Sequence, residues 1–353
     1  MPTSESGLNN AAANMTNIDS GRRSFCLALG VAGLLALAPP AARAAETGAA
    51  AGPIPYPPII GAMKTYVTKY TDTFADLGRK YGLGYTELVA ANPGIDPWVP
   101  GKATKLVLPS WHILPDAPHE GIVINLADQR LYYFRGKGIV QTAPLGIGDD
   151  GWNTPTGATK VVRKKANPTW HIPKSIRAVH PELPASIPPG PENPLGDRAM
   201  YLAWNGYLIH GTNKPDGVGR RVSHGCIRMY PEDIHRFFNE VKIGTPVRVV
   251  NQTVKVARYA GRVWLEVAPN QAQTLEIEQT GHMTPAKPPE FEATVILGAG
   301  DLRDRIDWPT AYRVASERRG YPVAITPGPK KDENAPLVAE ERTPAPHAGT
   351  TQP

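Results

Sequence analysis

The chain has 353 residues, of which 41% are hydrophobic and 20% are charged, and its formal net charge is +6 at pH 7. This length accommodates two domains and a tail, and the apolar fraction is sufficient for ordinary globular cores. The basic residues form no long cluster and no nucleic-acid-binding motif is present, so nucleic acid is not a predicted partner. The small positive excess suits an anionic cell-wall environment.

The first 44 residues are predicted to be a secretory signal peptide. Arg22 and Arg23 precede an apolar run over 25–38, and the small residues at 42–44 resemble a cleavage site. The run is shorter than the roughly 20 residues that a membrane-spanning helix needs. We therefore expect an exported, periplasmic protein without a membrane span in the mature chain. The paired arginines also resemble a twin-arginine signal, and both the export route and a start at Met15 stay open.

A proline-rich linker is predicted over 45–63, and a small module over 64–109. Runs at 65–68 and 104–108 predict two strands, with two helical segments between them. This strand-helix-helix-strand order, with Asn92-Pro93 after the second helix, resembles a lysin-motif (LysM) domain, a family that binds glycans containing N-acetylglucosamine. The simpler alternative is that Asn92-Pro93-Gly94 is a turn without a binding role.

From Gly121 onward the pattern predicts β-structure. Six short runs have the composition of strands, and they lie at 122–125, 130–134, 139–144, 158–162, 207–210 and 246–251. The proline-rich stretch over 167–196 predicts a long irregular loop. We interpret this loop as a covering flap or the wall of a groove, and a passive insertion is the alternative.

Helices are predicted later in the chain. Pro231 favours a first helical turn, and the residues that follow it form one apolar stripe: Ile234, Phe237, Phe238 and Val241. Residues 253–325 are predicted to be a C-terminal extension, with a hairpin over 254–267 and a short helix over 309–320 that ends at a glycine cap. From residue 326 the composition predicts a disordered tail over 326–353.

Cys226 is the one cysteine that remains after removal of the signal peptide, because Cys26 lies within that peptide. An unpaired thiol in an oxidising compartment is a liability unless it is buried or used. Only a small fraction of an ordinary thiol is ionised at neutral pH, so a nucleophilic role requires a neighbouring base. His210 and His224 are both candidates, and the sequence does not choose between them.

The neighbours of Cys226 have predicted roles as well. If 223–226 is extended, then His224, Cys226 and Arg228 project from one face. The amides of Gly225 and Cys226 are candidate donors to an oxyanion. Arg228 suits a substrate carboxylate, and a salt bridge to Asp233 is the alternative.

Ser223 either braces this loop or contacts the substrate. No spacing of potential ligands predicts a metal site, and the proposed thiol chemistry requires no cofactor.

Two segments resemble the active-site signature of the L,D-transpeptidases (YkuD catalytic domain). The first is His210-Gly211-Thr212, and the second is 220–229, which includes Ser223-His224-Gly225-Cys226-Ile227-Arg228. The resemblance spans residues 120–252. It implies a sandwich-like β-fold, Cys226 as the nucleophile, His210 as the general base, and His224 with Ser223 as residues that shape the site. The expected fold class is thus α+β and mainly β, with a LysM (βααβ) module, the catalytic domain and a partly disordered tail.

The resemblance also implies an activity on peptidoglycan. The thiolate would attack the bond between diaminopimelate and the terminal D-Ala of a tetrapeptide stem, D-Ala would leave, and an amine would resolve the thioester. The acceptor would be another diaminopimelate or a lysine of an outer-membrane lipoprotein. Arg228 stands where many members carry Asn, which is similar to the lipoprotein-anchoring branch. Hydrolysis of stems or lipoprotein links, and a non-catalytic wall-binding scaffold, are the alternatives.

Overall fold

The computed structural model describes residues 55–328 of the chain. The predicted signal peptide, residues 45–54 of the predicted linker and the tail beyond residue 328 lie outside the described residues. Within 55–328, no helix is both long enough and apolar enough to cross a membrane.

The first module has the predicted strand-helix-helix-strand order, with an antiparallel pair of strands: β2 (Lys64–Val67), α1 (Phe74–Tyr81), α2 (Tyr85–Ala91) and β3 (Lys105–Leu108). Thr73 begins α1 as its N-cap by accepting a hydrogen bond from the Asp76 amide at 3.1 Å. The Asn92 side chain joins the end of α2 to β3, since it donates to the Leu88 carbonyl and accepts from the Val107 amide. Asn92 therefore fixes the packing of the module in addition to ending its second helix.

Part of the predicted linker is regular structure. β1 (Ile59–Gly61) pairs antiparallel with β4 (Trp111–Ile113), which directly follows the module. Ile59 and Ile113 are both buried against Ala257 of the C-terminal extension. This small apolar cluster explains why the end of the linker has a defined position.

The largest element is an eight-stranded mixed sheet with the order β15-β13-β12-β9-β16-β5-β6-β7. Its strands are β5 (Gly121–Asn125), β6 (Arg130–Phe134), β7 (Val140–Pro144), β9 (Gly157–Ala166), β12 (Arg198–Leu202), β13 (Leu208–His210), β15 (Ile227–Arg228) and β16 (Pro246–Val250). The six predicted strands are all present, and β9 is longer than predicted. β12 and β15 were not predicted.

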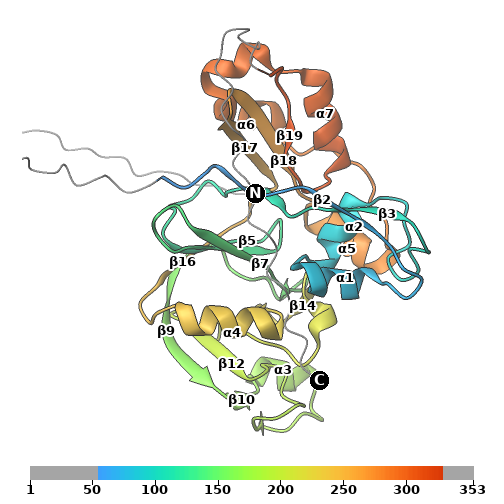
Figure 1. Cartoon of the computed structure of the whole chain (residues 1–353). Coiled ribbons are helices and arrows are strands. Elements are labelled where there is room, and N and C mark those ends of the chain that lie inside the picture. Colours follow the sequence, from blue (N-terminus) through green and yellow to red (C-terminus); the bar gives the residue numbers. More distant parts are fainter. Residues whose placement is uncertain (1–54, 329–353) are drawn as a thin grey trace, which may run out of the picture. The chain divides into compact units, whose positions relative to one another are not determined.

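The helix α4 (Pro231–Glu240) packs on one face of this sheet, as its apolar stripe predicts (Figure 1). Ile234, Phe237 and Val241 are fully buried there. The short parallel pair β8 (Ile147–Gly148) and β14 (Arg221–Ser223) also contributes to this core. The mainly β domain is therefore confirmed, as a mixed sheet with helix α4 packed on it.

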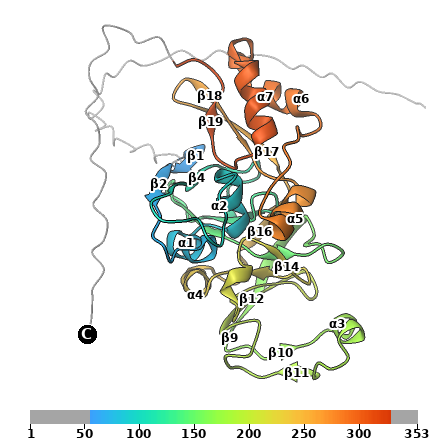
Figure 2. The same cartoon turned by 90° about the vertical axis from the view of Figure 1, so that its right-hand side faces the viewer.

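The prediction of an irregular loop over 167–196 is wrong in part. β10 (Trp170–His171) pairs with β11 (Ser186–Ile187), and α3 (Lys174–Val179) lies between them. The buried Asn193 side chain donates to the carbonyl of Pro168 at 2.8 Å and so joins the two ends of the segment. Figures 1 and 2 show these elements beyond the end of β9.

The C-terminal extension forms its own apolar core. The predicted hairpin is present and pairs with a third strand, and helices cover it: β17 (Val254–Tyr259), β18 (Arg262–Val267), α5 (Gln271–Thr280), α6 (Phe291–Ala299), α7 (Trp308–Glu317) and β19 (Val323–Ala324). The predicted glycine cap is wrong, because α7 ends at Arg318 in a left-handed conformation. Thr326 is buried and its hydroxyl accepts from the Val263 amide, so the predicted tail does not begin at residue 326.

Candidate active site

The loop that carries Cys226 is a turn between two sheets. β14 ends at Ser223 and β15 begins at Ile227, and Gly225 between them has a φ of 96°. A Cβ atom at Gly225 would lie 2.9 Å from a ring carbon of Tyr207. The segment 223–226 is therefore not extended, and glycine is required by both the backbone conformation and the adjacent ring.

Ser223 braces this turn. Its hydroxyl donates to the Cys226 carbonyl at 2.5 Å and accepts from the Gly225 amide at 3.2 Å. The hydroxyl of Thr154 donates to the Gly225 carbonyl at 2.9 Å from outside the loop. Of the two predicted roles of Ser223, these hydrogen bonds agree with the bracing one. The Gly225 amide is engaged by Ser223, which does not favour its predicted role as an oxyanion donor.

Cys226 is partly buried, and its Sγ lies 3.4 Å from the carbonyl oxygen of Gly206. Burial raises the pKa of the thiol above its usual value. A backbone hydrogen bond from Leu208 and the charge of Arg228 act in the opposite direction without reversing the shift. The thiol is thus protonated at neutral pH, and its activation requires a base.

His210 is a buried and neutral imidazole. Burial, reinforced by the nearby positive charge of Arg228, lowers its pKa to about 3. Its Nδ1 lies 2.6 Å from the Gly211 carbonyl oxygen, and because a carbonyl can only accept, Nδ1 carries the proton. Nε2 consequently holds a lone pair, which is the state that a general base needs.

His224 has a different environment although it lines the same cavity as Cys226. It is exposed, and its ring meets the Trp152 ring edge-on at 4.7 Å between centroids. Partial burial and the charge of Arg228 lower its pKa. The structure therefore brings both candidate histidines to the cavity but surrounds only His210 closely with protein.

Arg228 faces the cavity from β15. The alternative partner considered for it, Asp233, forms its ion pair with Arg236 at 2.7 Å. Arg228 has no ion pair in the part of the chain that the structure describes. Its guanidinium is therefore available to an anion that enters the cavity.

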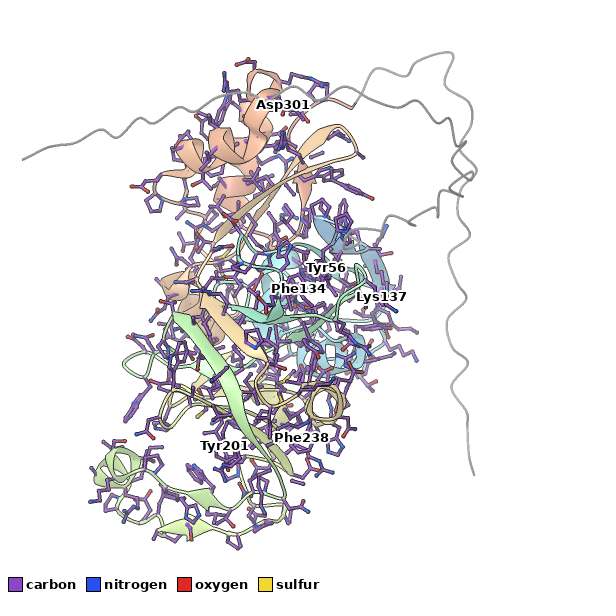
Figure 3. All side chains as sticks on the ribbon, turned by 90° about the vertical axis from the view of Figure 1, so that its left-hand side faces the viewer. Tyr56, Phe134, Lys137, Tyr201, Phe238 and Asp301 are labelled. Carbon is purple, nitrogen blue, oxygen red and sulfur yellow. The ribbon has the colours of Figure 1, made fainter. Side chains whose placement is uncertain are left out.

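The cavity has a volume of about 560 Å³ and lies on the face of the sheet opposite α4. Sequence reasoning missed part of its lining, namely Arg163 and Lys165 of β9 and Tyr201 of β12. The guanidinium of Arg163 stacks on the Tyr201 ring at 3.6 Å, and Figure 3 shows Tyr201 beside β9. No local motif contains these residues, because they reach the cavity through strand pairing across the sheet.

The proline-rich segment forms one wall of the same cavity. Trp170, Ile176 and Leu195 line it from this segment. The interpretation of this stretch as a groove wall therefore agrees with its position, although the segment is more regular than the sequence predicts.

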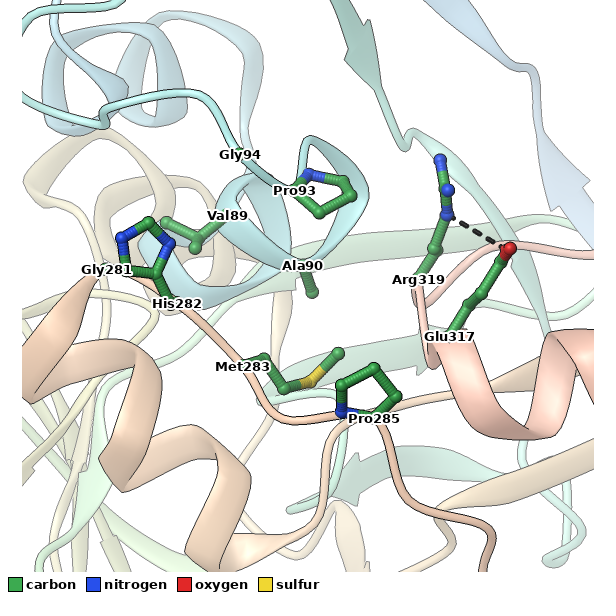
Figure 4. Close-up of a pocket in the computed structure, with 10 residues that line it drawn as sticks. All are labelled: Val89, Ala90, Pro93, Gly94, Gly281, His282, Met283, Pro285, Glu317 and Arg319. Carbon is green, nitrogen blue, oxygen red and sulfur yellow. Dashed lines mark ion pairs between the residues drawn. The ribbon is translucent and has the colours of Figure 1, made fainter.

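A second cavity, of about 280 Å³, lies between the end of α2 and residues 281–285 (Figure 4). Glu317 and Arg319 form an ion pair of 3.1 Å at its edge. Its lining contains no cysteine, and His282 is its one imidazole. This second cavity therefore offers no thiol, whereas the cavity described above contains Cys226.

Comparison with known proteins identifies the family. The family described as YkuD, L,D-transpeptidase catalytic domain, matches residues 119–249. The Escherichia coli strain K12 protein named probable L,D-transpeptidase YcfS is 42% identical over 239 residues, which are 64% of this chain and 72% of that protein. The Salmonella typhimurium protein named probable L,D-transpeptidase ErfK/SrfK is 37% identical over 279 residues, which are 77% and 87% of the two chains.

A solved structure of a mutant L,D-transpeptidase from Enterococcus faecium is 24% identical, with a TM-score of 0.29 over 37% of this chain and 49% of that one. The assignment rests on the sequence relatives, which match this chain over most of their own length. The chain belongs to the L,D-transpeptidase family.

Proposed function

We propose that this enzyme is a periplasmic L,D-transpeptidase in which Cys226 is the nucleophile and His210 is the general base. The observation that carries the assignment is the position of His210, whose Nδ1 is held by the Gly211 carbonyl in the cavity that contains Cys226. A protonated thiol and a neutral base are the two partners that a proton transfer requires.

The first half of the reaction releases D-Ala. His210 accepts the proton of the Cys226 thiol as the sulfur attacks the carbonyl between the L-centre of diaminopimelate and the terminal D-Ala. The amide of Cys226 donates to the oxyanion, since Ser223 occupies the Gly225 amide. The tetrahedral intermediate collapses, the carbon–nitrogen bond breaks, and His210 returns its proton to the D-Ala nitrogen. A thioester on Cys226 remains.

The second half transfers the acyl group to an amine. His210 accepts a proton from the acceptor nitrogen as that nitrogen attacks the thioester, and the departing Cys226 sulfur takes the proton back. The acceptor is a diaminopimelate of another stem or a lysine of an outer-membrane lipoprotein. Arg228 holds the terminal carboxylate of the donor in the first half, because its guanidinium faces the cavity without an acidic partner.

We further propose that residues 64–109 are a LysM domain that binds the glycan. Two loops of this module lie side by side, since the Phe74 amide donates to the Pro97 carbonyl. Each loop exposes an aromatic side chain, Tyr70 at 81% and Trp98 at 54% exposure. Exposed rings of this kind suit the apolar faces of sugars. Binding to the glycan would raise the concentration of peptide stems near the catalytic domain.

The test of catalysis is an incubation of the mature protein with disaccharide-tetrapeptides, with and without a peptide that ends in lysine, followed by mass spectrometry. We expect D-Ala release together with a cross-linked dimer or a peptide conjugate. Cys226→Ala should abolish all products, and product formation by this variant would sink the mechanism. Tripeptide as the sole product would favour hydrolysis, and an inert wild type would favour a scaffold.

The roles of the two histidines are tested by separate substitutions. His210→Ala should lower the rate of Cys226 acylation by about 10²-fold to 10⁴-fold, the usual contribution of a general base. His224→Ala should lower it by less than about tenfold, because that ring is exposed. The reverse order would exchange the two roles.

A further inference from the structure

The charged side chains of arginine and lysine that line the cavity containing Cys226 are not balanced by acidic side chains. Arginine and lysine side chains line the cavity at three positions, Arg163, Lys165 and Arg228, whereas none of its lining residues is an aspartate or a glutamate. No ion pair within residues 55–328 involves any of the three cations. Uncompensated cations around a cavity favour an anionic ligand.

A β-bulge places two of these cations on the cavity face. In the pairing of β9 with β12, Arg163 pairs with Tyr201 but Val161 pairs with Leu202, so Val162 is an extra residue. Val161 and Leu202 face the core beneath α4. If Val162 were paired as a regular strand residue, alternation from Val161 would turn Arg163 towards that core. The bulge instead directs Arg163 and Lys165 into the cavity, a common use of bulges beside active sites.

The strand register separates these two cations from the third. Lys165 pairs with Ala199, Ala199 with His210, and His210 with Arg228. These three steps, of about 4.8 Å each, place the Lys165 and Arg228 backbones about 14 Å apart. The cavity thus has one cation beside Cys226 and a cationic pair three strands away, so it suits a ligand with two separated anionic groups.

One member of the cationic pair, Arg163, is held in place, and this arrangement favours the recognition of an anionic group. The Arg163 guanidinium stacks on Tyr201 at 3.6 Å, which restricts its position. Lys165 is exposed beside it on the same face of β9. A planar guanidinium next to a flexible ammonium group matches the requirements of a carboxylate.

We propose that Arg163 and Lys165 bind a second carboxylate of the donor, the one at the far end of the diaminopimelate side chain. This inference rests on the proposed function, which places the L-centre of diaminopimelate at Cys226 and the terminal carboxylate at Arg228. The side chain of diaminopimelate carries its second carboxylate beyond several methylene groups, and this spacing suits the separation of the two cationic positions. The pair thereby makes the enzyme selective for donors in which that carboxylate is free.

The carboxylate that binds this pair can come from the donor or from the acceptor, because an acceptor can also bring a carboxylate into the cavity. The two sources act at different steps. A donor carboxylate affects the formation of the thioester, whereas an acceptor carboxylate affects only its resolution.

The experiment measures the formation of the Cys226 thioester by intact-protein mass spectrometry, without an acceptor. Three disaccharide-tetrapeptide donors are compared: one with diaminopimelate, one with its side-chain carboxylate amidated, and one with lysine in its place. We expect the wild type to react with the free-carboxylate donor about tenfold to a hundredfold faster than with the others, as for a charge-assisted hydrogen bond. The Arg163→Gln, Lys165→Gln double variant should lose this preference.

Lys160→Gln is the matched control, because Lys160 lies on the same strand, is exposed and does not line the cavity. It should keep the wild-type preference, and Arg163→Lys with Lys165 intact should retain part of it. Equal reaction of the wild type with all three donors would overturn the inference and leave the proposed function intact. A wild type that forms no thioester with any donor would instead contradict the proposed function.

A second arm follows transfer from the preformed thioester to amines with a free or an amidated carboxylate. An effect of the double variant confined to this arm would assign the pair to the acceptor and overturn the donor assignment.

Discussion

The burial of the His210 ring makes the stability of the protein depend on pH. Its pKa of about 3 lies far below the ordinary value of 6.5, because burial and the charge of Arg228 oppose protonation. In the unfolded chain the ring binds a proton below about pH 6.5. In the folded chain it does so only near pH 3. The stability associated with the neutral ring is present above pH 6.5 and is lost as the pH falls towards 3.

The corresponding prediction concerns His210→Gln. The wild type should lose up to about 1.4 kcal/mol of unfolding free energy per pH unit through this residue as the pH falls below about 6.5. His210→Gln should remove that part of the slope, because glutamine does not titrate. Urea unfolding over this pH range measures it, with the exposed His224→Gln as the control. Parallel pH dependences of wild type and His210→Gln would show that the His210 pKa is not depressed.

The backbone conformation of Gly225 permits a second test. Gly225→Ala should destabilise the protein by about 1–2 kcal/mol, because an L-residue is strained at positive φ. The new Cβ also meets the Tyr207 ring, so acylation of Cys226 should fall further than stability alone explains. Gly151→Ala is the matched control, since its φ is 78° and no atom lies within 4 Å of the added Cβ. Equal acylation by the two folded variants would contradict a steric role for Tyr207.

At the scale of elements, the predictability of the fold follows the strength of local patterns. The hairpin of β5 and β6 and the stripe of α4 repeat over many residues, and the sequence therefore predicts them. β15 contains two residues and is defined by its partners in space. Its position could not be predicted from local sequence.

The site shows the same division. A sequence motif predicts Cys226, His210 and Arg228 as candidates, and all three line one cavity. The cavity-facing side of Arg163 depends on a bulge at Val162, and the surrounding run of valines and basic residues gives no sign of it. Likewise, the turn at Gly225 separates β14 from β15, and the sequence does not decide whether 223–226 is extended.

The first module supports the loop that leads to Cys226. The Thr86 hydroxyl donates to the Gly219 carbonyl at 2.7 Å, and the Thr86 amide donates to the same oxygen at 3.1 Å. The next residue, Arg220, stacks its guanidinium on the Tyr85 ring at 3.5 Å. α2 therefore fixes the start of the segment that becomes β14 and the turn that carries Cys226.

Thr86→Val should consequently affect catalysis as well as stability. The loss of a buried hydrogen bond costs about 1–3 kcal/mol, and a displaced Gly219 should slow Cys226 acylation on the order of tenfold. Thr68→Val is the control, because Thr68 is also buried in the module but donates to the Gly101 carbonyl and not to the loop that leads to Cys226. Denaturant unfolding and acylation rates are measured for both. Similar acylation by the two variants would show that the module does not position the loop.

At the scale of the whole described chain, buried charges join segments that are distant in sequence. Lys255 of the extension lies 2.7 Å from Asp128 of the sheet domain and 2.8 Å from Glu266 of β18. Arg130 of β6 pairs with Glu87 of the first module at 2.6 Å. These pairs hold the module, the sheet domain and the extension as parts of one compact unit within 55–328.

Lys255→Met should destabilise the protein by about 3–5 kcal/mol, because it leaves Asp128 and Glu266 buried without their cation. The Lys255 side chain is only 1% exposed, so water cannot replace it. Lys287→Met removes an ion pair of the same length, 2.7 Å to Glu292, whose lysine is 49% exposed. That control should cost no more than about 1 kcal/mol. Guanidinium unfolding measures both variants, and equal losses would mean that the buried pair does not hold the extension to the sheet domain.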